Sequence, residues 1–395
     1  MPLANTPRAY GSLARSLHWL TALLILTAIP LGLVANATAF DSAAALTRKA
    51  QLFSLHKTLG VAAFTVALAR ITVALIQPRP VPLHPGRRFE TWAAETAHWT
   101  LYIALLAVPL TGWVHHAATS GFAPILWPLG QDLPFVAKSE PLAQAASALH
   151  GVFGKLLAAA IVLHAAGALK HVLIDRDATL ARMLRGISAG ASAPHPRSLA
   201  PALSALALYA AGAGLAFALI SANPEPEPAA GAALPAASGN WRLEDGSLGF
   251  SVAQLGMPVR GSFADWTAAI TFDAASGSGT VAVQIMTSSL SIGSVTEQAR
   301  SAEFFDTATY PTASFQASIR PEAGGYIAEG SLALRGMTLP LSLPFSLEIT
   351  GDSATMQGTT RLDRRDYQMG VAYPDESSVG FGVDVSIRLT ATRQD

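Results

Sequence analysis

The sequence contains no cysteine, and this absence excludes several kinds of site at once. Disulfides, thiolate metal centres, iron–sulfur clusters and covalent c-type haem attachment all require cysteine sulfur. Charge is also scarce, since charged residues make up 13% of the 395 residues and the formal net charge is zero. We therefore expect no nucleic-acid partner, which would call for a positive field. Histidine remains as the main candidate metal ligand.

Apolar residues, by contrast, make up 51% of the chain, and their long runs lie in the N-terminal half. Five segments of about 20 residues are apolar enough to cross a bilayer as helices. The first resembles a cleaved signal peptide, but a discarded segment would have no use for His18, so a membrane span is favoured. The predicted spans are residues 17–37, 52–76, 97–114, 146–169 and 199–220.

Lysine and arginine are unevenly distributed over the connections between these spans. The N-terminal tail and the second and fourth connections hold nine of them, and the other two connections hold three. Because such residues accumulate on the cytoplasmic side, we expect the N-terminus inside and, after five spans, the C-terminal part outside. The sequence thus predicts a multi-pass protein of the bacterial cytoplasmic (inner) membrane whose C-terminal part is periplasmic.

Four histidines lie in the predicted spans at heights that match in pairs. On the fourth span, His150 and His164 are 14 residues apart, which is nearly four helical turns and roughly 21 Å of rise, so both lie near one face. With the N-terminus inside, His56 matches the outer height of His150, and His18 matches the inner height of His164. Ionisable side chains within a membrane usually face the protein interior and meet a partner there.

Two stacked histidine pairs suit two b-type haems, because each iron takes one imidazole on either face. With both axial positions filled, no open position remains for a substrate, which favours electron transfer over oxygen chemistry. The simpler interpretation is that these are helix-end histidines in interfacial water, and the matched heights argue against it. One zinc site is excluded, because ligands spread over about 20 Å cannot surround one ion.

Other polar residues could support the same sites. Arg70 lies 14 residues after His56 and shares its face at the inner height, where it could pair with a haem propionate or simply extend to the interface. Lys57 could do the same at the outer height. The remaining histidines are not expected to be ligands: His98, His115 and His116 lie at span ends, interfacial or beside a quinone, and His84, His171 and His195 lie in or beside inner connections, in contact with solvent.

Beyond the fifth span, both composition and periodicity change. A run rich in proline, alanine and glycine at residues 223–239 predicts a semi-stiff linker. From Trp241 onward, apolar residues alternate with small or polar ones, as at Val281, Val283 and Ile285, which is typical of half-buried strands. Many short strands separated by glycine-containing turns predict an antiparallel barrel or sandwich. A closed barrel of about eight strands can hold one elongated apolar ligand.

The N-terminal part contains five short motifs in order: SLHWL at 16–20, LHKTLG at 55–60, LHG at 149–151, LHAA at 163–166 and DRD at 175–177. With these motifs it resembles the bacterial cytochrome b561 family over about residues 8–183. The resemblance implies that His18, His56, His150 and His164 are the axial ligands of two b-type haems, paired as His56/His150 and His18/His164. It also implies electron exchange with ubiquinone or another isoprenoid quinone, and some members are superoxide:ubiquinone oxidoreductases.

The C-terminal part contains motifs that include GSF at 261–263, FFD at 304–306, YPTASF at 310–315 and LRGMT at 334–338. Over about residues 240–392 it resembles the YceI family of lipocalin-like periplasmic barrels, which is associated with polyisoprenoid or isoprenoid-quinone binding. Gly246 and Gln254 stand where the family commonly has histidine. The residues expected to line an apolar lumen, or else to fill a solid core, are Phe250, Val252, Phe263, Ile270, Phe272, Val283, Ile285, Phe315 and Val385.

We therefore expect a multi-domain membrane protein: an all-α diheme four-helix bundle (1–185), a cytoplasmic connection with a fifth transmembrane helix (186–222), a linker (223–239) and an all-β antiparallel lipocalin-like barrel (240–395). The expected function is electron transfer to or from isoprenoid quinone, with superoxide:ubiquinone oxidoreduction as one form of it, while the barrel binds quinone or polyisoprenoid. The alternatives are a membrane-anchored isoprenoid carrier or sensor, and a cytochrome subunit that serves a separate dehydrogenase as redox partner.

Overall fold

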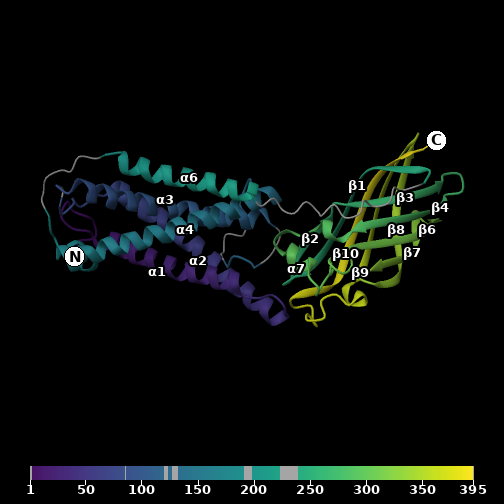
Figure 1. Ribbon diagram of the computed structural model, residues 1–395, viewed down its shortest axis with the longest axis horizontal. Coiled ribbons are helices and arrows are strands. Elements are labelled where there is room, and N and C mark those ends of the chain that lie inside the picture. The colour runs from purple at the N-terminus through teal and green to yellow at the C-terminus, as the bar shows by residue number, and fades with distance from the viewer. Residues whose placement is uncertain are drawn as a thin grey trace. The chain divides into compact units, whose positions relative to one another are not determined.

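The computed structural model describes residues 2–84, 86–119, 123–126, 132–190, 198–222 and 239–394. They form two compact units, a bundle of helices and a β-barrel, and each is described by itself (Figure 1). The linker expected at residues 223–239 lies outside the described residues except for Gly239, and His195 lies outside them as well.

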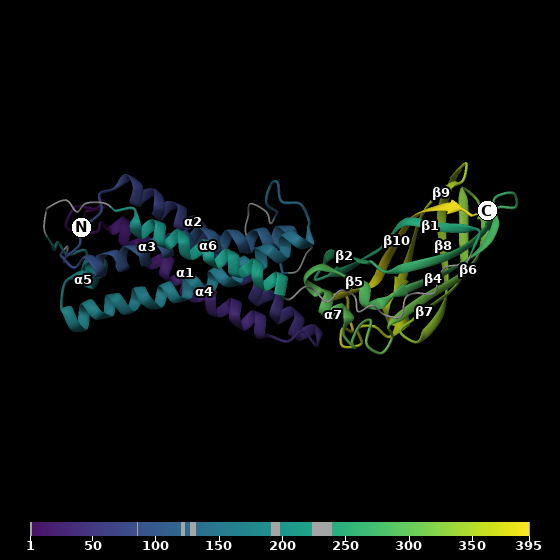
Figure 2. The same ribbon diagram turned by 45° about the horizontal axis from the view of Figure 1, so that its top comes forward.

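Five of the described helices are long and apolar enough to cross a membrane, as the sequence predicts. They run alongside one another in both views of the bundle (Figures 1 and 2). A shorter helix, α5 (Thr179–Arg185), follows the fourth of them. The five long helices are α1 (Ser12–Ala37), α2 (Ala43–Ile76), α3 (Arg88–Ala118), α4 (Glu140–Lys170) and α6 (Ala200–Ala222).

Several of these helices extend beyond the apolar segments that predict them. Helix α2 begins at Ala43 rather than at residue 52, and α3 begins at Arg88 rather than at residue 97. Hydropathy detects only the part of a helix that matches the hydrocarbon core, whereas the backbone hydrogen bonds continue into the polar ends. Helix α4 continues into a π-helical turn, His171–Asp175, which ends where Arg176 adopts a left-handed conformation with φ of 50°.

The bundle has an apolar exterior and small residues between its helices. Leu23, Leu26 and Leu33 of α1 are each more than half exposed, as expected of side chains that contact lipid. Ala67 on α2 and Ala104 on α3 are fully buried. Small residues allow helix backbones to approach closely where no hydrophobic force operates between helices.

Helix α6 packs against the bundle through specific contacts with α3 and α4. The hydroxyl of Tyr209 donates a hydrogen bond of 3.1 Å to the carbonyl oxygen of Thr100 on α3. The Tyr209 ring meets Phe153 of α4 edge-on at 5.0 Å between centroids. At Gly212, a Cβ would lie 3.0 Å from a methyl carbon of Leu156, so the absence of a side chain permits the close approach. The fifth membrane helix is therefore part of the packed bundle.

The second unit is a closed antiparallel barrel, which confirms the predicted fold. Eight strands form the closed circuit, since β10 pairs with both β9 and β1, and β1 also pairs with β3. Strands β2 and β5 extend the sheet beside the second half of β1. The strands are β1 (Trp241–Gln254), β2 (Met257–Phe263), β3 (Trp266–Asp273), β4 (Ser278–Met286), β5 (Leu290–Ser291), β6 (Thr312–Glu322), β7 (Gly325–Leu334), β8 (Met337–Thr350), β9 (Ser353–Asp363) and β10 (Val379–Arg393), and a short helix, α7 (Thr296–Arg300), lies between β5 and β6.

Two tight hairpins set the register of the barrel. The chain turns at Leu255 and Gly256 between β1 and β2, and at Arg335 and Gly336 between β7 and β8, and all four residues have positive φ. Two-residue turns of this kind match the right-handed twist of the flanking strands. The alternation expected in the strands is present, since Phe315 and its neighbours at every second position of β6 are buried and the residues between them are more exposed.

Candidate functional site

The rings of His56 on α2 and His150 on α4 lie close together within the bundle. Their ring centroids are 6.1 Å apart and the ring planes are 89° apart. Two nitrogen–metal bonds of about 2.0 Å, plus about 1.1 Å from each nitrogen to its ring centroid, give a centroid separation of about 6.2 Å. The spacing therefore suits two imidazoles on opposite faces of one metal ion. We call these two residues the outer pair.

Backbone carbonyl oxygens hold both rings of the outer pair. The Nδ1 atom of His56 lies 2.8 Å from the carbonyl oxygen of Ala28 on α1, and the Nδ1 atom of His150 lies 2.9 Å from that of Val108 on α3. A carbonyl oxygen only accepts, so each Nδ1 carries the hydrogen and donates it. The second nitrogen, Nε2, then keeps its lone pair. This is the arrangement by which proteins orient a histidine that binds a metal.

Two glycines provide the space that these rings occupy. A Cβ at Gly32 of α1 would lie 2.7 Å from Cε1 of His56, and a Cβ at Gly112 of α3 would lie 3.0 Å from Cε1 of His150. Gly32 lies four residues after Ala28, and Gly112 lies four residues after Val108, which is about one helical turn in each case. The glycine and the carbonyl that contact one ring are therefore on the same turn. One turn of α1 thus supports His56, and the corresponding turn of α3 supports His150.

His18 of α1 and His164 of α4 form a second pair, which we call the inner pair. Their ring centroids are also 6.1 Å apart, with 55° between the planes. The structure thus brings together the same two pairs that the sequence predicts from height. That these four residues bind haem iron stays a prediction.

The inner pair differs from the outer pair in what holds its rings. A guanidinium nitrogen of Arg70, Nη2, lies 3.0 Å from Nδ1 of His18. Because a guanidinium only donates, Nδ1 accepts here and the hydrogen lies on Nε2, opposite to the outer pair. The ring of His98 lies edge-on to His164 at 5.0 Å between centroids, so His98 belongs to the neighbourhood of the inner pair.

Near the outer pair, two further histidines take part in the packing of the bundle. Lys57 places Nζ 3.2 Å from Nδ1 of His116, and His116 is buried. His115 places Nδ1 2.9 Å from the carbonyl oxygen of Ala143 on α4. The tertiary packing therefore encloses His116 at this end of α3. Its position at the interface or beside a quinone stays a prediction.

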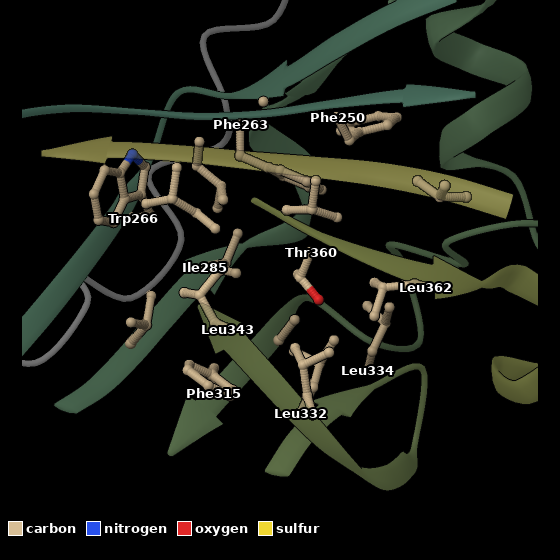
Figure 3. A pocket seen from close by; sticks show the side chains of 18 of the residues that line it. Phe250, Phe263, Trp266, Ile285, Phe315, Leu332, Leu334, Leu343, Thr360 and Leu362 are labelled. Carbon is tan, nitrogen blue, oxygen red and sulfur yellow. The ribbon is translucent and has the colours of Figure 1, made fainter. Parts of the chain in front are cut away.

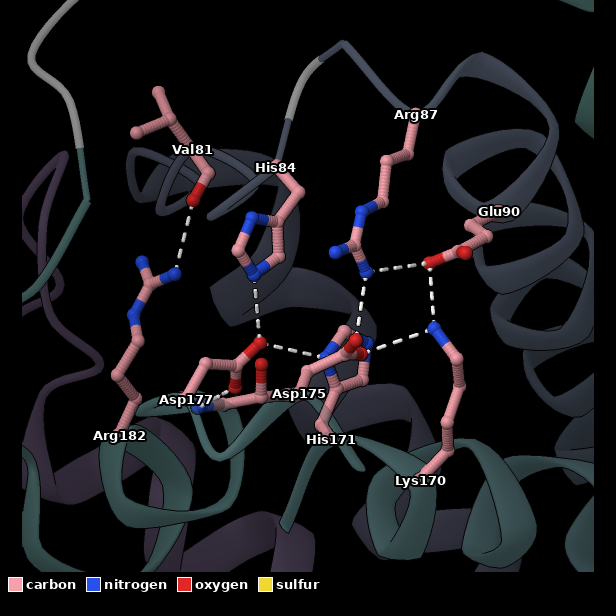
Figure 4. A network of polar contacts seen from close by, with 10 residues as sticks. Val81, His84, Arg87, Glu90, Lys170, His171, Asp175, Asp177 and Arg182 are labelled. Atoms are coloured by element: carbon pink, nitrogen blue, oxygen red, sulfur yellow. Dashed lines mark hydrogen bonds and ion pairs between the residues drawn. The ribbon is translucent and has the colours of Figure 1, made fainter. Parts of the chain in front are cut away.

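A polar network occupies the connections that follow α2 and α4 (Figure 4). His84 Nε2 and His171 Nδ1 lie 2.9 Å and 2.7 Å from the same oxygen, Oδ2 of Asp177. The two rings are parallel and 6.2 Å apart. The expected solvent contact is present, since the side chains of His84 and His171 are 37% and 25% exposed. Both also bind one carboxylate that is only 11% exposed. Two imidazoles and a carboxylate within 4.8 Å of one another could also hold a metal ion.

The same network ties the start of α3 to the end of α4. Arg87 contacts Asp175 at 2.8 Å, and Lys170 bridges Glu90 at 2.8 Å and Asp175 at 2.9 Å (Figure 4). Burial opposes ionisation of Asp177, but hydrogen bonds from Thr179 and from the two imidazoles hold the pKa of its carboxyl below the usual range. The Asp177 carboxylate is therefore stabilised in its charged form.

The barrel encloses an apolar cavity of about 270 Å³ (Figure 3). This volume is close to the lower end of the range for ligand pockets, about 300–1,000 Å³. All nine residues expected to face the lumen lie on the cavity wall, among them Phe250, Phe263, Ile285 and Phe315. Their contact with a ligand stays a prediction. The cavity itself shows that these side chains do not fill a solid core.

Comparison with known proteins identifies the helical part. A model described as prokaryotic cytochrome b561 matches residues 9–186. Cytochrome b561 homolog 2 of Escherichia coli (strain K12) is 32% identical over 186 residues, which are 47% of this chain and 95% of that protein. The chain belongs to the cytochrome b561 family. Probable superoxide oxidase CybB of Yersinia pestis is 25% identical over 181 residues, 45% of this chain and 96% of that protein.

This cytochrome b561 family member also carries a second domain of known type, since a YceI-like domain model matches residues 241–391. The crystal structure of Burkholderia cenocepacia BcnA is similar at 26% identity, over 37% of this chain and 96% of that chain, with a TM-score of 0.36. A polyisoprenoid binding domain from Saccharophagus degradans, implicated in plant cell wall breakdown, is similar at 15% identity, over 39% of this chain and 99% of that chain, with a TM-score of 0.31.

Sequence reasoning missed part of each site in this b561 family member. Nothing in the pattern of α1 or α3 marks Gly32 and Gly112 as neighbours of histidines, because the contact depends on how helices cross. Some residues of the barrel wall that the sequence analysis did not name could have been predicted from the sequence. Apolar residues alternate along β8 from residue 339 to residue 347, which is the pattern of a strand with one face toward the lumen. The wall also includes Leu332, Leu334, Leu341, Leu343, Phe345, Leu347 and Leu362, and the polar residues Gln254, Gln298, Thr360 and Arg364.

Proposed function

We propose that this protein is a membrane diheme b-type cytochrome that passes electrons to or from ubiquinone or another isoprenoid quinone. The observation that carries the proposal is the pair of equal spacings, 6.1 Å between ring centroids in both the outer and the inner pair. A haem held by each pair would supply one-electron transfer at a fully coordinated iron. Membership of the cytochrome b561 family supports this assignment.

In this proposal the chain's own residues fix the imidazoles before haem binds. Ala28 and Val108 accept from Nδ1 and direct Nε2 of His56 and His150 towards the space between the rings. At the inner pair, Nε2 of His18 can bind a metal only after Arg70 releases Nδ1. The guanidinium of Arg70 can then pair with a carboxylate. We propose that this carboxylate is a haem propionate.

We further propose that the barrel binds the isoprenoid tail of the quinone or a related polyisoprenoid. The apolar cavity and the YceI-like match support this part. The excess of positive residues in the N-terminal tail and in alternate connections supports a cytoplasmic N-terminus. With five spans, the same excess supports a periplasmic barrel. The relative from Yersinia pestis is named a probable superoxide oxidase, which makes superoxide the first electron donor to test.

Haem content of the purified full chain tests the proposal. We expect about two low-spin b haems per chain, and one haem after His56→Ala or His150→Ala. His84→Ala is the matched control, because His84 bonds to Asp177 outside both pairs and should leave two haems. A wild-type protein with one haem or none would contradict the four-ligand assignment.

The cavity favours a second candidate function, an isoprenoid carrier or sensor for which the helices serve chiefly as an anchor. This candidate predicts that His164→Ala leaves the cellular function intact. Loss of that function in a His164→Ala strain with normal membrane insertion would argue for the cytochrome instead.

A further inference from the structure

Three of the four polar side chains named on the cavity wall gather at one end. Gln254, the last residue of β1, pairs with Val379 at the start of β10. Arg364 donates to the carbonyl oxygens of Val379 at 3.1 Å and of Tyr373 at 2.6 Å. Gln298 Nε2 lies 2.8 Å from the hydroxyl of the same Tyr373. The otherwise apolar cavity therefore has one polar end.

Gln254 has unused hydrogen-bonding capacity at this end. Its side chain lines the cavity, only 5% of the residue is exposed, and its buried amide oxygen has no hydrogen-bond partner among the described residues. A buried amide without partners is costly, and native proteins rarely leave one unsatisfied. Because an amide has an oxygen acceptor and two N–H donors, it can serve a ligand hydroxyl or a ligand carbonyl equally.

Arg364, by contrast, has no N–H donor left for a ligand. A guanidinium has five N–H donors, and this one makes five hydrogen bonds. Phosphate recognition by arginine uses two of these donors in parallel, so a phosphate at this end would find none available. The five acceptors are the carbonyl oxygens of Met369, Gly370, Tyr373, Val379 and Gly380.

We propose that Gln254 is the head-group residue of the cavity and that the barrel selects isoprenoids with an uncharged, oxygen-bearing head over isoprenoid phosphates. Quinones, quinols and isoprenoid alcohols have such heads. The inference rests on the proposed isoprenoid binding and adds the end at which the head lies and the chemistry that it must have.

Two ligands with the same tail test the inference. The full chain in nanodiscs is dialysed against labelled farnesol or labelled farnesyl phosphate, with empty nanodiscs as the background. Farnesol should bind at least about tenfold more tightly than farnesyl phosphate. Farnesol lacks a quinone ring, so recognition of such a ring by the helical bundle contributes nothing to its binding.

Variants locate the head group. Gln254→Met keeps the size of the side chain and removes the amide, so farnesol affinity should fall about tenfold, whereas Gln254→His retains a donor and an acceptor and should stay near wild type. Gln316→Met is the matched control, because it makes the same change at an exposed residue of β6 that does not line the cavity. An unchanged thermal unfolding transition verifies that each variant is folded.

The outcomes separate this inference from the function on which it rests. If farnesyl phosphate binds as tightly as farnesol, or if Gln254→Met binds farnesol as wild type does, the head-group assignment is wrong while isoprenoid binding stands. If neither ligand binds above the background in any protein, isoprenoid binding by the barrel is wrong and the inference falls with it.

Discussion

The outer and inner histidine pairs have the same ring separation but different support. Backbone carbonyls of α1 and α3 hold the outer rings, and glycines of the same helical turns make room for them. In the inner pair, the side chain of Arg70 contacts His18 and the ring of His98 contacts His164. An imidazole that turns away from a helix carbonyl loses its hydrogen bond, whereas one bound to a side chain can move together with that side chain. The outer pair is therefore fixed by the fold and the inner pair is adjustable.

The largest effect that separates the pairs is expected from Gly32→Ala. The new Cβ would lie 2.7 Å from the His56 ring, which must shift from its position beside Ala28. Overpacking of this kind costs about 1–3 kcal/mol, which is roughly a five- to 150-fold loss of haem affinity at the outer pair. Haem titration of the apo-protein, with the two haems resolved by redox potential, measures this loss.

Gly154→Ala on α4 is the matched control for that substitution, because its Cβ would meet nothing within 4 Å. Both haems should bind to this variant as they bind to wild type. Loss of the inner haem in Gly32→Ala, with the outer one retained, would contradict the assignment of Gly32 to the outer pair.

A smaller effect, confined to the inner pair, is expected from Arg70→Gln. The guanidinium adjoins His18, and its positive charge favours the reduced, less positive iron. Removal of the charge should lower the midpoint potential of the inner haem by on the order of tens of millivolts. Spectroelectrochemical titration measures both potentials, and an equal shift of the outer haem would show that the two pairs are not distinct in the predicted way.

The smallest effect concerns the polar network of His84, His171 and Asp177. Because the pKa of Asp177 is lowered in the folded protein, its contribution to stability is complete above the ordinary carboxyl pKa of about 4 and is lost as pH falls through the folded pKa. Asp177→Asn should therefore unfold about 2–4 °C below wild type at pH 6. The gap should narrow as the pH falls below about 4, and it should close only below the folded pKa.

Thermal unfolding of both proteins between pH 3 and pH 7 measures this gap. Asp132→Asn is the control, since Asp132 is 79% exposed and its ion pair with Lys138 should add little. A gap that stays constant across the pH range would mean that the Asp177 carboxylate does not stabilise the fold through its charge.

The helical bundle and the barrel also differ in how far the sequence predicts their sites. Residue heights along membrane helices follow directly from spacing, so the partners of His150 and His164 were predictable before any helix was placed. The supports of those rings were not, because Gly32 and Val108 acquire their roles only where helices cross. Likewise the π-helical turn brings His171 to Asp177, and no local pattern marks that turn.

In the barrel, alternation predicts which residues face the lumen but not which of them has a free hydrogen-bonding group. The unpartnered oxygen of Gln254 depends on what β10 and the loop before it place nearby. From the sequence, Gln254 is noticeable only because the resemblance to the YceI family leads us to expect a histidine there. Its position at the polar end of the cavity requires the folded structure.

The pairing itself is tested most directly by the haem content of double histidine variants. We predict that His56→Ala/His150→Ala retains one haem per chain, as either single variant does, because both substitutions remove the same site. His56→Ala/His18→Ala should retain none, because it removes one ligand from each pair. The opposite pattern, with no haem in the first double variant and one in the second, would contradict the two pairs on which this account depends.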